Sequence, residues 1–170
     1  MTSYLRSWRA ALAAQQAIEA QQAAVLADLA DAALLRSIPG FGPQVIATLL
    51  GELGDLTRFD DPRQPQKMAG LNLTQQSSGQ HHGRTHITRR GRPGARAILY
   101  QAACVAVAKD PQWKAWYHGL TRRPGQALAP KAALVAVATK LLRVAWACVS
   151  HRIAYDPTRL FARQEVMPAA

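Results

Sequence analysis

The chain has 170 residues, of which 49% are apolar, and its mean hydropathy is −0.12. That length suffices for one domain with a real core, and this composition excludes an intrinsically disordered chain. The formal net charge is +11, and the sequence pI is near 10.7. Such an excess of positive charge predicts a polyanionic or acidic partner and salt-sensitive binding.

The charge is unevenly distributed along the chain. Residues 1–62 contain four Lys or Arg and seven acidic residues, whereas residues 63–170 contain seventeen Lys or Arg and three acidic residues. The polyanion-binding surface is therefore expected in the second part. No signal peptide is apparent, and Lys140 and Arg143 interrupt the longest apolar stretch, which argues against a membrane span. Cys104 and Cys148 lie in apolar helical runs and are expected to be free thiols.

Residues 4–35 are rich in Ala and Gln and contain neither Gly nor Pro, which predicts one long helix. Two short apolar stripes, around Trp8 and around Leu26, suggest that this helix packs on a partner helix as an arm or coiled coil. An ordinary first helix of a bundle is the alternative. The predicted organisation is an arm at 1–35, a compact domain at 36–155 and a flexible tail at 156–170.

The segment 35–43 contains Gly40 and Gly42, and a helix-periodic apolar run follows it at 45–53. The two glycines permit a tight hairpin between helices, and Pro43 suits the first turn of the second helix. The pattern resembles a helix-hairpin-helix, which presents backbone N–H groups to a phosphate without reading the base. A plain glycine-rich turn between two helices is the alternative.

Helical periodicity continues in a short piece at 62–69 and in two longer runs at 95–109 and 130–151. Between them, residues 75–94 form a polar loop rich in Gly, His and Arg, and no segment shows convincing strand alternation. We therefore predict an all-α fold in which an arginine-rich loop carries the function.

The loop contains Ser78 directly before Gly79, in a turn where a hydroxyl can be exposed. Arginines crowd the same neighbourhood, at Arg84, Arg89, Arg90, Arg92 and Arg96. Guanidinium groups bind phosphate in a forked geometry and stabilise charge on a phosphate under attack. A nucleophilic serine also needs a base, and three histidines could supply it: His81, His82 and His86. The plainer alternative is a surface that only binds nucleic acid, and no Cys or carboxylate completes a metal site with the histidines.

Further basic and aromatic residues follow the loop. Arg122, Arg123 and Lys131 flank an exposed Pro-Gly turn and are predicted to contact phosphates. Trp113 and Trp146 have the spacing of core residues, whereas Trp116 fits either core packing or stacking on unpaired nucleotides.

In chain order, these features are similar to the C-terminal transposase domain of the IS-one-ten family, the bridge-RNA-guided insertion-sequence recombinases. The resemblance extends from Ile38 to Val149, about two-thirds of the chain. The family's Leu-x-x-Ile-Pro-Gly-x-Gly hairpin appears at 35–42, its Ala-Gly-Leu-x-Pro element at 69–73 and its Ser-Gly at 78–79. Its Ser-Lys-x-Gly and Leu-Arg appear at 88–91 and 95–96, and its late Lys-Leu at 140–141.

The resemblance implies that Ser78 is the nucleophile, which attacks DNA and forms a phosphoserine link, with Ser77 as the fallback. Arg89 stands where the family has Lys, Arg96 matches the family's Arg, and Lys140 matches its late Lys. Two departures, Leu73 for Pro and Ala95 for Leu, are tolerable substitutions.

The resemblance also implies partners and a cofactor. The family binds DNA and a structured guide RNA, and its N-terminal RuvC-like half carries four acidic residues that bind Mg²⁺. No such set is present here, so we expect this chain to begin where that half ends, to bind no metal itself and to be inactive alone. We expect the chain to assemble with another copy of itself or with full-length transposase through the first helix. We expect it in the bacterial cytoplasm, and at the nucleoid when it is bound to DNA.

Two alternatives remain at this stage. One is a non-catalytic helix-hairpin-helix protein that binds nucleic acid. The other is a truncated regulator that joins full-length transposase and blocks its assembly.

Overall fold

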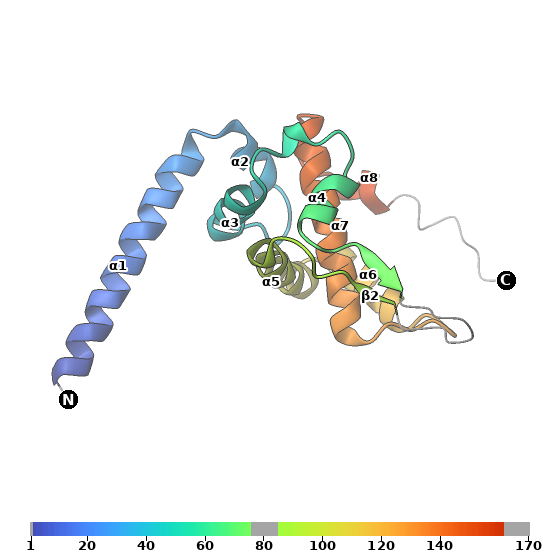
Figure 1. Cartoon of the computed structure of the whole chain (residues 1–170), viewed down its shortest axis with the longest axis horizontal. Coiled ribbons are helices and arrows are strands. Elements are labelled where there is room, and N and C mark those ends of the chain that lie inside the picture. Colours follow the sequence, from blue (N-terminus) through green and yellow to red (C-terminus); the bar gives the residue numbers. More distant parts are fainter. Residues whose placement is uncertain (1, 76–84, 162–170) are drawn as a thin grey trace.

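The computed structural model describes residues 2–75 and 85–161, and this part of the chain is mainly α-helical, as predicted (Figure 1). The helices are α1 (Thr2–Ala27), α2 (Ala30–Arg36), α3 (Pro43–Leu53), α4 (Arg63–Met68), α5 (Pro93–Lys109), α6 (Pro111–Thr121), α7 (Pro130–Ser150) and α8 (Pro157–Phe161). A short 3-10 helix, η1 (Leu56–Arg58), and two strands, β1 (Leu73–Gln75) and β2 (Thr85–Ile87), complete the fold.

The core forms around α5 and α7, which pack against each other and against α3 and α6 (Figure 1). Proline occupies the first turn of α3, α5, α6 and α7, where its missing N–H costs no helical hydrogen bond. Leu49, Leu99 and Leu141 are completely buried where these helices meet. Burying each such side chain stabilises the fold by about 1.5–3 kcal/mol.

The helix α7 is long and apolar enough to cross a membrane by length and composition alone. Nine of its residues are buried inside the fold, where it contacts α2, α4, α5 and α6. We therefore interpret α7 as the central core helix of the domain.

The predicted single helix at 4–35 is wrong in one respect, because the chain breaks into α1 and α2 at Asp28 and Leu29. Leu29 adopts an extended backbone, with φ −94° and ψ 111°. The break turns α2 onto the domain, so that Ala32 and Leu35 are buried, while α1 extends away from the body (Figure 1). Tertiary packing decides this break, since no glycine or proline marks it.

The prediction that no strand exists is also wrong. The strands β1 and β2 pair antiparallel, with Leu73 opposite Ile87, Thr74 opposite His86 and Gln75 opposite Thr85. Three-residue strands are too short to show an alternating pattern in the sequence.

Other predictions about packing are confirmed. Trp113 is completely buried, and Trp146 is half-buried with its Nε1 donating to the Phe59 carbonyl at 2.8 Å. Both cysteines are free thiols. The first residues of the predicted tail form α8, whose Phe161 lies edge-on against Trp113, and residues 162–170 lie outside the described part of the chain.

The two glycines of the hairpin between α2 and α3 differ in their surroundings, which provides a matched test of the fold. A Cβ on Gly40 would lie 2.4 Å from the carbonyl oxygen of Ala102 in α5, and its φ of +86° disfavours any other residue. Gly40→Ala is therefore expected to lower the free energy of unfolding by about 1–3 kcal/mol. The control Gly42→Ala meets nothing within 4 Å and should cost less than about 1 kcal/mol. Equal urea-unfolding midpoints for the two variants would contradict this assignment.

Candidate nucleic-acid interface

The strands β1 and β2 continue at their inner ends into two backbone segments that run side by side. We call residues 68–72 and 88–92 the hairpin root. Three backbone hydrogen bonds join its halves: Thr88 N–H donates to Asn72 O at 2.8 Å, Arg89 N–H to Gly70 O at 3.1 Å and Arg92 N–H to Met68 O at 2.9 Å. The root therefore holds the segment 88–92 at a defined position against α4.

Two glycines make this close approach possible. A Cβ on Gly91 would lie 2.1 Å from the Met68 carbonyl oxygen, and one on Gly70 would lie 2.6 Å from the Arg90 carbonyl oxygen. Both residues have positive φ, +133° for Gly91 and +70° for Gly70. The glycines of the Ala-Gly-Leu and Arg-Arg-Gly elements are thus required by backbone-to-backbone packing.

Three predicted arginines belong to the root, and a fourth, Arg96, lies beside it. Arg89, Arg90 and Arg92 are exposed, and Arg89 adopts a left-handed backbone with φ +55°. Arg96, in the first turn of α5, is half-buried and its Nη1 donates to the Ala69 carbonyl at 2.9 Å. That bond ties α5 to the root, since it bridges two segments 27 residues apart.

The charge of these arginines is not neutralised within the described residues. The ion pairs there are Arg152 with Asp31 and Arg159 with Asp156, both remote in sequence from the root. The carboxylate of Glu52 lies against Gly94 at the start of α5, where it faces the positive end of a helix dipole, and it forms no ion pair with the arginines. The root therefore presents a positive surface to solvent.

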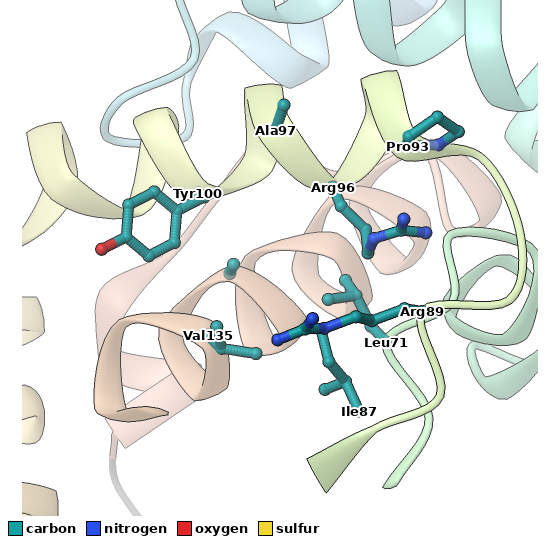
Figure 2. A pocket seen from close by; sticks show the side chains of 9 residues that line it. Leu71, Ile87, Arg89, Pro93, Arg96, Ala97, Tyr100 and Val135 are labelled. Carbon is teal, nitrogen blue, oxygen red and sulfur yellow. The ribbon is translucent and has the colours of Figure 1, made fainter. Parts of the chain in front are cut away.

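The consecutive residues Arg89 and Arg90 line two different hollows. The first, which we call the apolar hollow, measures about 290 Å³ and lies between α5 and α7 (Figure 2). Its walls include the side chains of Leu71, Ile87, Arg89, Arg96, Tyr100 and Val135. The other, which we call the second hollow, measures about 570 Å³ and is lined by Gln64, Lys67, Met68, Asn72, Thr88 and Arg90.

The remaining predicted residues lie elsewhere. Ser77, Ser78 and Arg84 lie outside the described residues, as do His81 and His82. Arg122, Arg123 and Lys131 are exposed, in the connection between α6 and α7 and at the start of α7. None of these three lines either hollow.

Lys140 is half-buried and lies in an aromatic environment. Its Nζ lies 4.3 Å from the ring centroid of Trp116 and 4.6 Å from that of Phe161. Burial lowers the pKa of Lys140 from its usual value. Trp116 also packs edge-on against Trp113, so the aromatic cluster joins α6 and α7 to α8.

Sequence reasoning missed three residues that line the hollows: Lys67, Gln64 and Tyr100. Lys67 is just before the Ala-Gly-Leu element, but nothing in its sequence context marks it as a neighbour of Arg90. Tyr100 belongs to the helical run after the loop, and its sequence context indicates only a helix. Only the packing of α4 and α5 against the root brings these side chains to it.

The Mg²⁺ that the family resemblance implies does not fit the described residues. Among them, no group of three or more His, Cys, Asp or Glu is arranged to hold a metal ion. No step of the chemistry is therefore assigned to a metal bound by these residues.

The fold and the root together define a class: a mainly α-helical domain with an unneutralised arginine cluster at the base of a β-hairpin. A family model described as the transposase IS116/IS110/IS902 family matches residues 32–118. The chain belongs to this family, as the sequence motifs predicted.

Proteins with similar sequences are named as transposases or as insertion-element proteins. The chain is 32% identical to a probable family 20 transposase of Pseudomonas aeruginosa over 129 residues, 72% of this chain and 36% of that protein. It is 28% identical to a transposase for insertion sequence element IS1111A of Coxiella burnetii, over 74% of this chain and 34% of the relative. An uncharacterized 44.8 kDa protein of insertion element IS116 from Streptomyces clavuligerus is 26% identical over 74% of this chain. The chain spans about a third of the length of these relatives.

The bond from Arg96 to Ala69 predicts a structural role for this arginine besides its charge. Arg96→Lys keeps the charge but loses the planar donor, and it should lower the free energy of unfolding by about 1–2 kcal/mol. The matched control Arg92→Lys changes an exposed side chain and should stay within about 0.5 kcal/mol of the parent. Urea unfolding measures both, and an unchanged stability of Arg96→Lys would show that the bond contributes nothing.

Proposed function

We propose that this chain is the DNA-binding and serine-bearing part of an insertion-sequence transposase, which acts in DNA transposition and recombination. Family membership supports transposition as the process. The arginine cluster at the hairpin root supports binding of a polyanion such as DNA. The observation that carries the proposal is that four arginines gather there without an acidic partner among the described residues.

The chemistry of the root suits phosphate. Each guanidinium presents planar, paired N–H donors that match two phosphate oxygens. Backbone hydrogen bonds of Arg89 and Arg92 hold the segment that also carries Arg90, so this backbone is preorganised before DNA arrives. Contacts of this kind fix the position of a duplex and carry no sequence information.

The hairpin between α2 and α3 offers a second phosphate contact. Gly42 is exposed and precedes the first turn of α3, where helical N–H groups have no helical acceptor. Gly40 packs against α5 instead, so its contribution is to hold the hairpin on the domain. Arg122, Arg123 and Lys131 would extend the contact surface along the duplex.

The nucleophile is assigned from the family resemblance. Ser78, with Ser77 as the fallback, lies in the segment 76–84 between the two paired strands, outside the described residues. A serine hydroxyl attacks phosphorus only when a base or nearby positive charge assists it. Arg89 and Arg90 follow the same hairpin and would stabilise negative charge on the attacked phosphate.

Partners follow from the same family. A structured guide RNA is proposed as a second ligand, and Mg²⁺ is proposed to belong to an acidic domain of the complete enzyme. The helix α1 exposes apolar side chains, among them Tyr4, Trp8 and Ile18, which would suit assembly with another copy or with full-length transposase. We propose that the protein acts in the bacterial cytoplasm and lies at the nucleoid when it is bound to DNA.

These exposed apolar residues of α1 also favour one alternative function. A chain that joins full-length transposase through α1 would regulate its assembly without catalysing transfer. A non-catalytic helix-hairpin-helix binding protein is the other alternative. Both alternative functions require binding to DNA or to protein, and neither requires the hydroxyl of Ser78.

The arginine cluster predicts a specific salt dependence. Arg89→Ala combined with Arg90→Ala should weaken duplex binding and lower the slope of log affinity against log salt by about 2, since each phosphate contact contributes about 0.9. The charge-matched control, Arg6→Ala with Arg9→Ala, removes two exposed arginines of α1 and should leave the slope unchanged. Fluorescence anisotropy with a labelled duplex measures both, and equal slopes would remove the root from the interface.

The serine assignment predicts a separation of binding from chemistry. The chain alone, mixed with Mg²⁺ and labelled duplex, should yield no covalent protein–DNA adduct. In a reaction complemented with the family's acidic domain, Ser78→Ala should abolish strand transfer and retain duplex binding, with Ser77→Ala as the matched control. Unchanged transfer in Ser78→Ala, or an adduct formed by the chain alone, would refute the assignment.

A further inference from the structure

The apolar hollow between α5 and α7 is a site that phosphate binding by itself does not explain (Figure 2). We propose that it receives a single unpaired base of bound DNA. This inference rests on the proposed DNA binding and deepens it, because it names the part of the substrate that one face of the root holds.

The size and walls of the hollow fit one flat ring. Its volume of about 290 Å³ is near the lower limit of small-ligand pockets, about 300 Å³. Aliphatic side chains of Leu71, Ile87 and Val135 line it, and Tyr100 provides an aromatic surface from α5. Base–aromatic stacking is the main way in which proteins hold unpaired nucleotides, because every base has a π-face.

The positive charge around the hollow favours a ligand in which a ring is linked to an anionic group. In Figure 2, the side chain of Arg89 reaches under α5 toward Val135, and Arg96 extends from α5 into the same space. No carboxylate lines the hollow, and neither arginine has an ion-pair partner among the described residues. A base inside the hollow would keep its own phosphates near these guanidinium groups.

The lining also explains why the base must be unpaired. In a duplex, neighbouring bases cover both faces of each base, and only the edges are accessible in the grooves. Apolar walls gain free energy only from the faces, so a base must leave the stack to enter. The second hollow, with Lys67 and Arg90, has no aromatic residue in its lining and suits the phosphate backbone instead.

The test uses three DNA probes: a paired duplex, the same duplex with one bulged fluorescent aminopurine, and the same duplex with an abasic bulge. The parent chain should bind the aminopurine bulge about fivefold or more tightly than the abasic bulge. Ala97→Trp places a large ring over the hollow from an exposed position of α5 and should remove this preference. The matched control Ala108→Trp changes an exposed alanine of α5 outside the hollow and should keep it.

A further variant tests the base site without filling the hollow with a large side chain. Tyr100→Ala removes the stacking surface, keeps both arginines and should also reduce the preference for the aminopurine bulge. Binding of the paired duplex should stay the same in all three variants, because the phosphate contacts are retained.

Each contrary outcome has a distinct meaning. Equal affinity of the parent for the aminopurine and abasic bulges, with the paired duplex still bound, overturns the base site and leaves the proposed function standing. Loss of preference in Ala108→Trp as well as Ala97→Trp overturns the location. Tighter binding of an equivalent bulged RNA overturns the assignment to DNA. Failure to bind any probe at low salt overturns both the base site and the proposed function.

Discussion

The contact between the backbones of Met68 and Gly91, and of Gly70 and Arg90, is the constraint on which the rest of the site depends. These segments approach so closely that no side chain fits on either glycine. The approach fixes the path of the chain from β2 into α5 and places the consecutive residues Arg89 and Arg90 in the walls of two different hollows. A single backbone crossing thus lies between two hollows with different lining residues, one with Tyr100 and the other with Lys67.

The helix α5 connects this crossing to the other half of the domain. At its start, Arg96 bonds to Ala69 and Tyr100 lines the apolar hollow. Farther along the same helix, the backbone at Ala102 lies directly against Gly40 of the hairpin between α2 and α3. Both predicted phosphate-binding elements are therefore built on the same helix.

A partly buried polar bridge joins α4 to α7. Gln66 is 7% exposed, donates to the Leu71 carbonyl and accepts from two nitrogen atoms of Arg143 in α7 at 3.0 and 2.8 Å. Arg143 belongs to the pair of charges that argued against a membrane span, and here it satisfies a buried side chain of another helix. Lys140, the other member, lies over the rings of Trp116 and Phe161. Lys140 and Arg143 are thus accommodated by packing within the domain.

The sequence by itself determined the class of fold, the family and the identity of the arginine cluster, because these depend on composition, helical period and ordered motifs. It also located the tight hairpin at Gly40, whose positive φ favours glycine, whereas the close approach at Gly70 and Gly91 is visible only in the structure. Only the tertiary structure decided that the first helix breaks at Leu29, that a short hairpin forms, and that Lys67 and Tyr100 join the arginines. These features arise from contacts between segments far apart in the chain, and local patterns carry no record of such contacts.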